Sequence, residues 1–299
     1  MRTTAPTEVG ALAAEAVGEL LTRTTAGRLV GDYVETDSIP WRVFEDGGWD
    51  QIGVAEADGG GGATLRDLAE VGLMWGEFCV PLPLLESSVV RRWSAAARAE
   101  PGPVTVSVET AGTPPGSGLA PFAALAGVRV ARAIGSNDDE LRDGDGATPE
   151  PFAHGLRCAV LDWVTEVPDD ARVELEVVWA AEVVGAARRL LDLAVDYAKQ
   201  RVQFGRPIGG FQAVKHRLAD MHIETQLAET AVLWASVEPA EAHRPVRFAV
   251  DASIGVAQSA IQVHGAMGFT WELGLHYYLR SMLVRREMLH RTLTGGQLT

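Results

Sequence analysis

Two long helical patterns meet at one unusual turn, and this junction constrains the fold more than any other stretch. Upstream of it, apolar residues recur at three- and four-residue spacing through residues 177–198, as on one buried helix face. A run rich in glycine and proline, residues 205–210, then interrupts the pattern, because proline cannot continue a helix and glycine favours its end. The helical period resumes at Phe211. The turn between them, residues 201–212, carries two arginines, two glutamines and two phenylalanines, which is more than a simple connector needs.

Composition divides the chain into three zones and predicts a mainly α protein with a small β module. Residues 1–98 have helical periodicity, including a helix that Thr64 caps and that runs to residue 78, and another over 84–97. Residues 99–170 carry short β-branched runs between Pro, Gly and acidic turns, at 104–108, 127–134 and 158–164. Residues 171–299 are helical again, with helices expected at 173–202, 211–236, 246–264 and 274–293. We expect an N-terminal helical domain, a β domain and a C-terminal four-helix bundle.

The charge of the chain limits its partners. Lys and Arg number 26 against 40 Asp and Glu, so the formal net charge of the 299 residues is −14. This acidity argues against nucleic acid and against anionic membranes as partners. No uncharged apolar run is long enough to span a bilayer, and residues 1–10 carry no secretory signal pattern. The two cysteines, Cys79 and Cys158, have apolar neighbours, which predicts buried thiols and a cytoplasmic location.

Several common chemistries lack their motifs. The glycines of residues 59–62 are not followed by Lys-Ser/Thr and are not flanked by a strand and a helix, so they predict a flexible turn and not a phosphate loop. None of the seven histidines lies in a spacing that binds a metal. No Gly-x-Ser-x-Gly elbow is present either. We therefore expect neither a metal site nor a nucleophilic hydrolase.

A second unusual stretch, residues 262–269, closes the third helix of the expected bundle. Taken alone, its glycines predict an ordinary helix C-cap and a tight turn. Combined with the 201–212 turn, it gives two glycine-broken helix ends in one bundle, and these ends carry Arg, Gln and His. A diphosphate bound to an acidic protein needs a local positive charge and N–H donors, which Arg201 and Gln203 can supply.

These two stretches resemble the C-terminal domain of acyl-CoA dehydrogenases. The first reads Arg201-x-Gln203-Phe204-Gly205-x-Pro207-Ile208-x-x-Phe211-Gln212, and the second reads Gln262-x-His264-Gly265-x-x-Gly268-Phe269. Between them, residues 215–221 are also similar to the family, and Arg280 follows them. The resemblance is strong over residues 171–288. It is looser in the N-terminal zone, where it rests on residues 53–65 and 81–87.

The resemblance implies an enzyme that uses FAD. Such enzymes remove a proton from the α-carbon of an acyl-CoA with a glutamate and pass a hydride from the β-carbon to the flavin. By similarity, Arg201, Phe204 and Gln212 contact the adenosine diphosphate part of the FAD of a neighbouring subunit. Gln262, His264, Gly265 and Ala266 line the same diphosphate. Such a site forms only across a subunit interface, so the resemblance also implies oligomerisation.

The catalytic glutamate of the family has no clear counterpart here. Counting forward from Arg280, its commonest position falls on Leu289, and the alternative position in the first long helix falls near Leu175. Leucine cannot accept a proton. The nearby carboxylates are Glu174, Glu176 and Glu287. Glu174 and Glu176 are off the face of Leu175 and predict a solvated helix start, because adjacent helical residues are roughly 100° apart. We therefore assign no catalytic residue to this chain.

The β zone also departs from the family. Around the flavin ring the family usually has a Thr/Ser-Glu-Pro-x-x-Gly-Ser-Asp loop and a Trp-x-Thr segment. This chain has Ser107-Val108-Glu109-Thr110-Ala111-Gly112 instead, and its Trp163-Val164-Thr165 lies late in the module. The module is also short. We expect an intact contribution to the FAD diphosphate but a reduced grip of this subunit on flavin ring and acyl chain.

Together these features resemble the base-lacking subunit of an actinobacterial heteromeric acyl-CoA dehydrogenase. The partners implied are a second dehydrogenase subunit in an α2β2 complex and an acyl-CoA substrate, with a steroid side-chain CoA ester as a candidate. Two alternatives stay open. One is a self-sufficient homo-oligomer with a displaced glutamate base, and the other is a flavin-free structural or interaction protein of the same fold.

Overall fold

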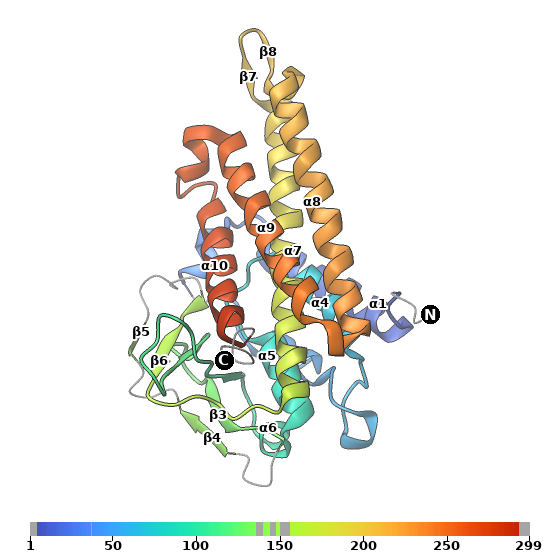
Figure 1. Ribbon diagram of the computed structural model, residues 1–299, viewed down its shortest axis with the longest axis vertical. Coiled ribbons are helices and arrows are strands. Elements are labelled where there is room, and N and C mark those ends of the chain that lie inside the picture. Colours follow the sequence, from blue (N-terminus) through green and yellow to red (C-terminus); the bar gives the residue numbers. More distant parts are fainter. Residues whose placement is uncertain (1–4, 37, 136–139, 144–147, 150–155, 293–299) are drawn as a thin grey trace, which may run out of the picture.

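The N-terminal third of the computed structural model is helical, as predicted. The structure describes residues 5–36, 38–135, 140–143, 148–149 and 156–292. The elements before the β zone are α1 Glu8–Thr25, α2 Val30–Val34, α3 Arg42–Glu45, the 3-10 turns η1 Trp49–Gln51 and η2 Glu56–Asp58, α4 Leu65–Gly76, α5 Leu84–Trp93 and α6 Ala95–Ala99. Figure 1 shows them beside the lower half of a long helical bundle.

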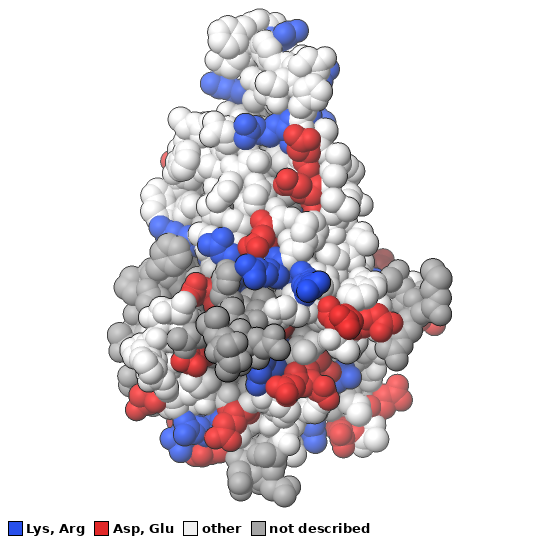
Figure 2. All heavy atoms as spheres, viewed as in Figure 1, with Lys and Arg blue, Asp and Glu red and all other residues white. Residues whose placement is uncertain are grey.

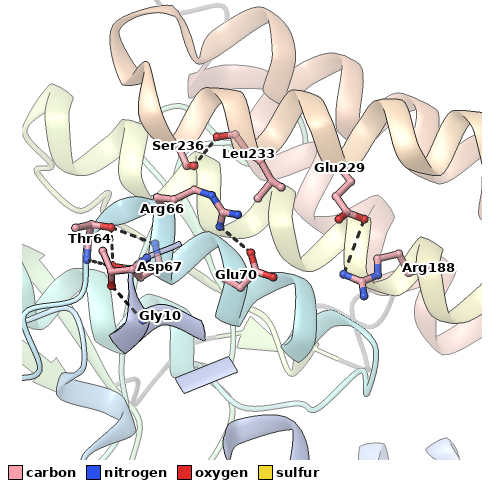
Figure 3. A network of polar contacts seen from close by, with 10 residues as sticks. Gly10, Thr64, Arg66, Asp67, Glu70, Arg188, Glu229, Leu233 and Ser236 are labelled. Atoms are coloured by element: carbon pink, nitrogen blue, oxygen red, sulfur yellow. Dashed lines mark hydrogen bonds and ion pairs between the residues drawn. The ribbon is translucent and has the colours of Figure 1, made fainter. Parts of the chain in front are cut away.

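The start of α4 is fixed by the predicted cap. The Thr64 hydroxyl accepts a hydrogen bond from the Asp67 N–H, and the Asp67 side chain accepts one from the Thr64 N–H at 2.9 Å. This reciprocal pair of Thr64 and Asp67 satisfies two backbone donors that a helix start otherwise leaves open (Figure 3). The same carboxylate accepts the Thr7 N–H at 2.7 Å, so it also anchors the start of α1. Burial opposes ionisation of Asp67, but the hydrogen bonds from Thr64 and Thr7 leave its pKa below the ordinary value.

Two small sheets follow α6. One sheet has the strand order β1-β3-β4, with β1 Val104–Val106, β3 Arg129–Ala133 and β4 Glu140–Asp143. The other has the order β2-β6-β5, with β2 Gly118–Ala120, β6 Ala159–Leu161 and β5 Thr148–Pro149. Strands β1 and β3 pair in parallel, and Val104 lies opposite Arg129. The three predicted apolar runs therefore form β1, β3 and β6.

The C-terminal zone is the predicted four-helix bundle. Its helices are α7 Asp169–Gln200, α8 Gln212–Val237, α9 His243–His264 and α10 Leu275–Thr292. Helices α7 and α8 are joined by the hairpin of β7 Val202–Gln203 and β8 Arg206–Pro207 and by the turn η4 Ile208–Gly210; η5 Pro239–Glu241 and η6 Gly265–Phe269 are the other connections. In Figure 1 the hairpin projects from the far end of the bundle, away from the sheets.

Glycines let α4 and α7 pack in unusually close contact. A Cβ on Gly185 would lie 1.9 Å from the Leu73 carbonyl oxygen, and one on Gly76 would lie 1.9 Å from the Glu182 carbonyl oxygen. Neither carbonyl group can move aside unless its whole helix shifts. The crossing of these two helices, which joins the N-terminal helices to the bundle, therefore requires glycine at both positions.

A charged cluster is buried where α5, α7 and α10 meet. Arg285 is 1% exposed, and its guanidinium lies 2.5 Å from a Glu86 oxygen and 2.7 Å from a Glu182 oxygen. The Trp179 indole N–H donates to the same Glu86 oxygen at 2.9 Å. Sequence analysis did not identify this cluster, because its three charged members are far apart in the chain.

Three local predictions need correction. The expected helix over 84–97 is two helices, because Ser94 leaves helical geometry and its hydroxyl accepts the Ala97 N–H to cap α6. Cys158 is buried as predicted, but Cys79 is only partly buried. Glu140 and Asp143, assigned from the sequence to acidic turns at 137–140 and 143–146, are the two ends of β4, which pairs with β3. The rest of the acidic turns falls outside the described residues. In the part of the chain that the structure describes, no helix is long and apolar enough to cross a membrane.

Candidate cofactor site and candidate bases

The turn that stood out in the sequence forms a tight hairpin. Val202 pairs with Pro207 and Gln203 with Arg206, so the loop between the strands consists of Phe204 and Gly205. Their φ angles are 52° and 79°. Two consecutive residues with positive φ suit the right-handed twist of a two-residue hairpin. Glycine adopts this conformation freely, whereas Phe204 adopts it at a cost, which is typical of functional positions.

The hairpin presents its side chains to solvent. Phe204 is 93% exposed and Val202 is 54% exposed. Arg201, at the end of α7, Gln203 and Gln212, at the start of α8, are also exposed. The tip of the molecule in Figure 2 is white surface with a few blue basic atoms. A large aromatic side chain that protrudes this far from its own subunit is suited to contact another molecule.

One arginine at this tip was not singled out from the sequence. The Arg206 guanidinium lies 4.1 Å from the centre of the Phe211 ring, and the Phe204 ring meets the same ring edge-on at 6.1 Å. This contact holds the Arg206 guanidinium over the Phe211 ring. The sequence indicated Arg206 only as one of the two arginines of the turn.

The second motif lies at the end of α9. Gly265 ends the helix with φ 61° and ψ −136°, a conformation open essentially to glycine, and a Cβ there would meet nothing within 4 Å. Gly265 is partly exposed, so a ligand can approach its backbone closely. Ala266 and Gln262 are exposed, whereas His264 is 5% exposed.

A ring contact joins the two motifs. The rings of His264 and of Tyr197, which lies one helical turn before Arg201, are 4.5 Å apart. The structure thus brings the predicted residues of both motifs to the same end of the bundle. Tyr197 was not predicted, because a tyrosine at helical spacing looks like any other core residue.

The imidazole of His264 is neutral and can accept a hydrogen bond. Its Nδ1 lies 2.8 Å from the Ala260 carbonyl oxygen, which can only accept, so Nδ1 carries the proton. Burial lowers the pKa of His264, and this hydrogen bond opposes the fall only in part. The ring is therefore neutral near pH 7, and its Nε2 is an acceptor. The exposed arginines Arg201 and Arg206 supply positive charge at this end of the bundle.

These residues fit half of an FAD site. Exposed arginines can pair with a diphosphate, and the open backbone at Gly265 lets phosphate or ribose approach closely. Phe204 supplies a flat apolar surface. Phe204 and the arginines are exposed on the surface of the chain, so a ligand held by them would be left uncovered on its other side.

Ser107 and Thr165, from the segments compared with the flavin-ring motifs of the family, make hydrogen bonds within the β module. The Ser107 N–H donates to the Thr165 hydroxyl at 2.7 Å, and the Thr165 hydroxyl donates to the Ala131 carbonyl at 2.6 Å. The Ser107 hydroxyl donates to the Trp163 carbonyl at 2.8 Å. Ser107 and Thr165 are buried. Their hydroxyls therefore bind strands together and do not face a ligand.

Both family positions for the base are core positions. Leu175 is 1% exposed and Leu289 is 2% exposed, and both belong to the main hydrophobic core. Neither can move a proton.

Two of the three nearby glutamates differ from the prediction. Glu174 and Glu176 are 9% and 4% exposed, so the expectation of a solvated helix start was wrong. Glu174 accepts the Trp93 indole N–H at 2.9 Å and lies 3.4 Å from the Arg92 guanidinium, because α5 packs across the start of α7. Glu287 accepts the Ala111 N–H at 3.0 Å and so ties α10 to the loop after β1.

Glu174 has the surroundings of a functional carboxylate. Burial raises its pKa, which Arg92 and the hydrogen bond from Trp93 oppose. Arg92 and Trp93 also line an open cavity of about 650 Å³, together with Gly53, Ala55, Glu56, Gly62 and Ala63. A carboxyl with a raised pKa whose polar partners line a cavity is a candidate base.

The fold and the paired helix-end motifs define the class of flavin-linked acyl-CoA dehydrogenases, and comparison with known proteins agrees. The family model described as "Acyl-CoA dehydrogenase, C-terminal domain" matches residues 176–288. Acyl-CoA dehydrogenase IpdE2 of Mycolicibacterium smegmatis is 30% identical over 284 residues, which cover 87% of this chain and 90% of the relative. IpdE2 of Mycobacterium tuberculosis is 30% identical over 282 residues, or 86% and 88% of the two chains. The chain belongs to the acyl-CoA dehydrogenase family.

Solved structures share the fold over nearly the whole chain. A chain of the Tcur3481-Tcur3483 steroid ACAD has a TM-score of 0.74 at 24% identity and covers 97% of this chain and 96% of its own. A chain of the ChsE4-ChsE5 complex from Mycobacterium tuberculosis has a TM-score of 0.74 at 20% identity, with coverages of 98% and 96%. Butyryl-CoA dehydrogenase from Megasphaera elsdenii has a TM-score of 0.71 at 17% identity, with 99% of both chains covered.

Proposed function

We propose that this chain is a subunit of a heteromeric, FAD-dependent acyl-CoA dehydrogenase that contributes diphosphate contacts across the subunit interface and no catalytic base. The observation that carries the proposal is a contrast within one chain. The arginine-bearing hairpin and the Gly265 backbone are open to a ligand, whereas both family positions for the base are buried leucines.

In the proposed complex, this chain binds and positions, and its partner does the proton chemistry. Arg201 pairs with the diphosphate, assisted by Gln203 and by Gln212 at the start of α8. Gln262, His264, Gly265 and Ala266 cover the same diphosphate from the end of α9. Bound FAD supplies the hydride acceptor for oxidation of the acyl-CoA. A glutamate of the partner subunit takes the α-proton.

A steroid side-chain CoA ester is the proposed substrate class, and α2β2 the proposed assembly. Both rest on the similarity to a steroid ACAD and to the two-protein ChsE4-ChsE5 complex. We place the complex in the cytoplasm.

Replacing Arg201 by alanine tests the diphosphate contact. Hydrogen bonds to charged groups contribute about 1.5–3 kcal/mol, so FAD should dissociate from the complex roughly tenfold to a hundredfold more readily. The measurement is flavin retained by the purified complex during dialysis. Arg23→Ala removes the same exposed side chain from α1 and should retain flavin as the wild type does. Equal flavin retention by both variants would show that Arg201 does not hold the diphosphate and would contradict this contact.

A self-sufficient dehydrogenase is the second candidate, and the surroundings of Glu174 favour it. In that case Glu174→Gln should reduce turnover by the isolated chain at least a hundredfold, as expected for removal of a general base. Glu287→Gln, which alters a carboxylate bound to the Ala111 N–H, is the matched control. The heteromer proposal predicts that the isolated wild-type chain already lacks turnover, so that neither substitution changes it.

A further inference from the structure

A buried arginine joins α10 to the β module and to the rest of the bundle. The Arg285 guanidinium carbon lies 5.4 Å from the centre of the Phe122 ring, in the loop after β2, and 5.6 Å from that of the Trp179 ring, on α7. Both aromatic side chains are 0% exposed. In Figure 1 the end of α10 points toward the two sheets. We call the contact of the Phe122 loop, residues 121–128, with α7 and α10 the seam.

The seam buries two carboxyl groups with one guanidinium. Arg285 pairs with Glu86 of α5 at 2.5 Å and with Glu182 of α7 at 2.7 Å. Glu86 is 1% exposed and Glu182 is 5% exposed. Among the residues that the structure describes, Arg285 is the only positive group that acts on Glu182. If both carboxyl groups were ionised, one negative charge would stay buried without a counter-charge, which is costly.

The other groups that face this cluster do not supply the missing positive charge. The Trp179 indole N–H donates to a Glu86 oxygen at 2.9 Å. The Cys79 thiol, in the turn after α4, faces Glu182 and Arg285, and the Cys158 thiol, just before β6, faces Arg285. Thiols are neutral or negative, so neither adds positive charge. A proton on one of the two carboxyl groups therefore balances the cluster.

This proton is bound to Glu182 and is lost near neutral pH. Burial raises the pKa of Glu182 from 4.5 to about 7; Arg285 opposes this rise and Glu86 adds to it. The closed arrangement is also incompletely satisfied, because the buried Arg285 Nε has no hydrogen-bond partner in the part of the chain that the structure describes.

The β-module side of the seam is strained. Phe122 has a φ of 63°, a conformation that is unfavourable for a large side chain. Its N–H donates to the Leu156 carbonyl at 2.8 Å, and its ring packs against Arg285. A residue that is held in such a conformation by its surroundings relaxes when those contacts weaken.

We infer that this cluster is a proton-controlled latch, in which a proton on Glu182 keeps the seam closed and its loss loosens the Phe122 loop and α10 from the bundle. Without the proton, two carboxylates share one arginine, and opening the seam lets water reach them. In the open seam the carboxyl loses its proton from about pH 4.5 upward, whereas in the closed seam it keeps the proton to about pH 7. Opening is therefore favoured as pH rises through this range and changes little above it.

Hydrogen exchange of the full-length chain tests the latch and needs neither flavin nor partner. It is measured by mass spectrometry at pH 5.5 and pH 8 and corrected for the intrinsic effect of pH on amide exchange. Amides of residues 119–128 and 278–289 should exchange roughly tenfold faster or more at pH 8. Residues 246–261 of α9 should stay protected at both pH values. Loss of protection in α9 together with the seam would mean that the chain unfolds as a whole, which would overturn the inference.

Three variants assign the response to the cluster. Glu182→Gln keeps the shape of the side chain but cannot ionise, so its seam should exchange slowly at both pH values. Glu70→Gln, which neutralises a carboxylate paired with Arg66 on α4, is the matched control and should respond to pH as the wild type does. Glu86→Gln leaves one carboxylate facing one arginine, so its response should be weaker. A wild-type seam that ignores pH would contradict the latch, as would a full response in Glu182→Gln or Glu86→Gln.

Discussion

Single residues carry the proposed division of roles, in which this chain contacts the cofactor and lacks the catalytic base. Leu175 and Leu289 could be recognised from the sequence, because register along a motif fixes where the base would stand. The burial of Glu174 could not, because it depends on Trp93 and Arg92, which α5 brings from about eighty positions away. The ring contact of Tyr197 with His264 could not be predicted for the same reason, because the residue spacing within one helix does not reveal which residues of another helix it contacts.

The buried Glu182 carboxyl gives a prediction of pH dependence. Burial raises its pKa from 4.5 to about 7; Arg285 lowers it and Glu86 raises it further. The folded chain therefore holds this proton to higher pH than the unfolded chain, so this group destabilises the fold as pH rises from about 4.5 through 7. Glu182→Gln should gain stability relative to the wild type between pH 5.5 and pH 8, as measured by urea unfolding at both values. A difference between the two proteins that does not change with pH would contradict this assignment.

At the scale of elements, helices were predicted well and their contacts were not. The apolar period of α7, α8 and α9 and the Thr64 cap are local signals, and the structure confirms them. The break at Ser94 and strand β4 were missed, because a short helix pair and an edge strand depend on what packs beside them. The local spacing of Gly76 and Gly185 did not indicate the close crossing of α4 and α7 that they allow.

The crossing of α4 and α7 gives a prediction of stability. Gly185→Ala places a methyl group against the Leu73 carbonyl and should cost about 3 kcal/mol of unfolding free energy, the upper end for overpacked cores. Gly112→Ala is the control, because its added Cβ would meet only the Thr110 hydroxyl, at 3.9 Å. It should change stability by no more than about 0.5 kcal/mol. Urea unfolding of the three proteins is the measurement, and equal stability of all three would show that the helices separate at little cost.

At the scale of the whole molecule, fold class and family follow from the sequence, whereas the role in an assembly does not. The predicted fold class was correct because the two C-terminal motifs lie at a set spacing in one bundle. The matching family model, the relative and the similar solved structure belong to the same family or fold. Whether the hairpin reaches a diphosphate bound to another subunit depends on surfaces that only a complex brings together. The domain limits at about residues 98 and 170 stay a prediction. They fall before β1 and before α7, where limited proteolysis can test them.

Flavin content, measured by visible absorption, tests the central claim most directly. The purified chain would be compared alone and co-purified with an acyl-CoA dehydrogenase subunit that carries the catalytic glutamate. The account predicts bound flavin and acyl-CoA oxidation in the complex, and neither in the isolated chain. Stoichiometric flavin with full activity in the isolated chain would contradict it and would direct attention to Glu174 as the base.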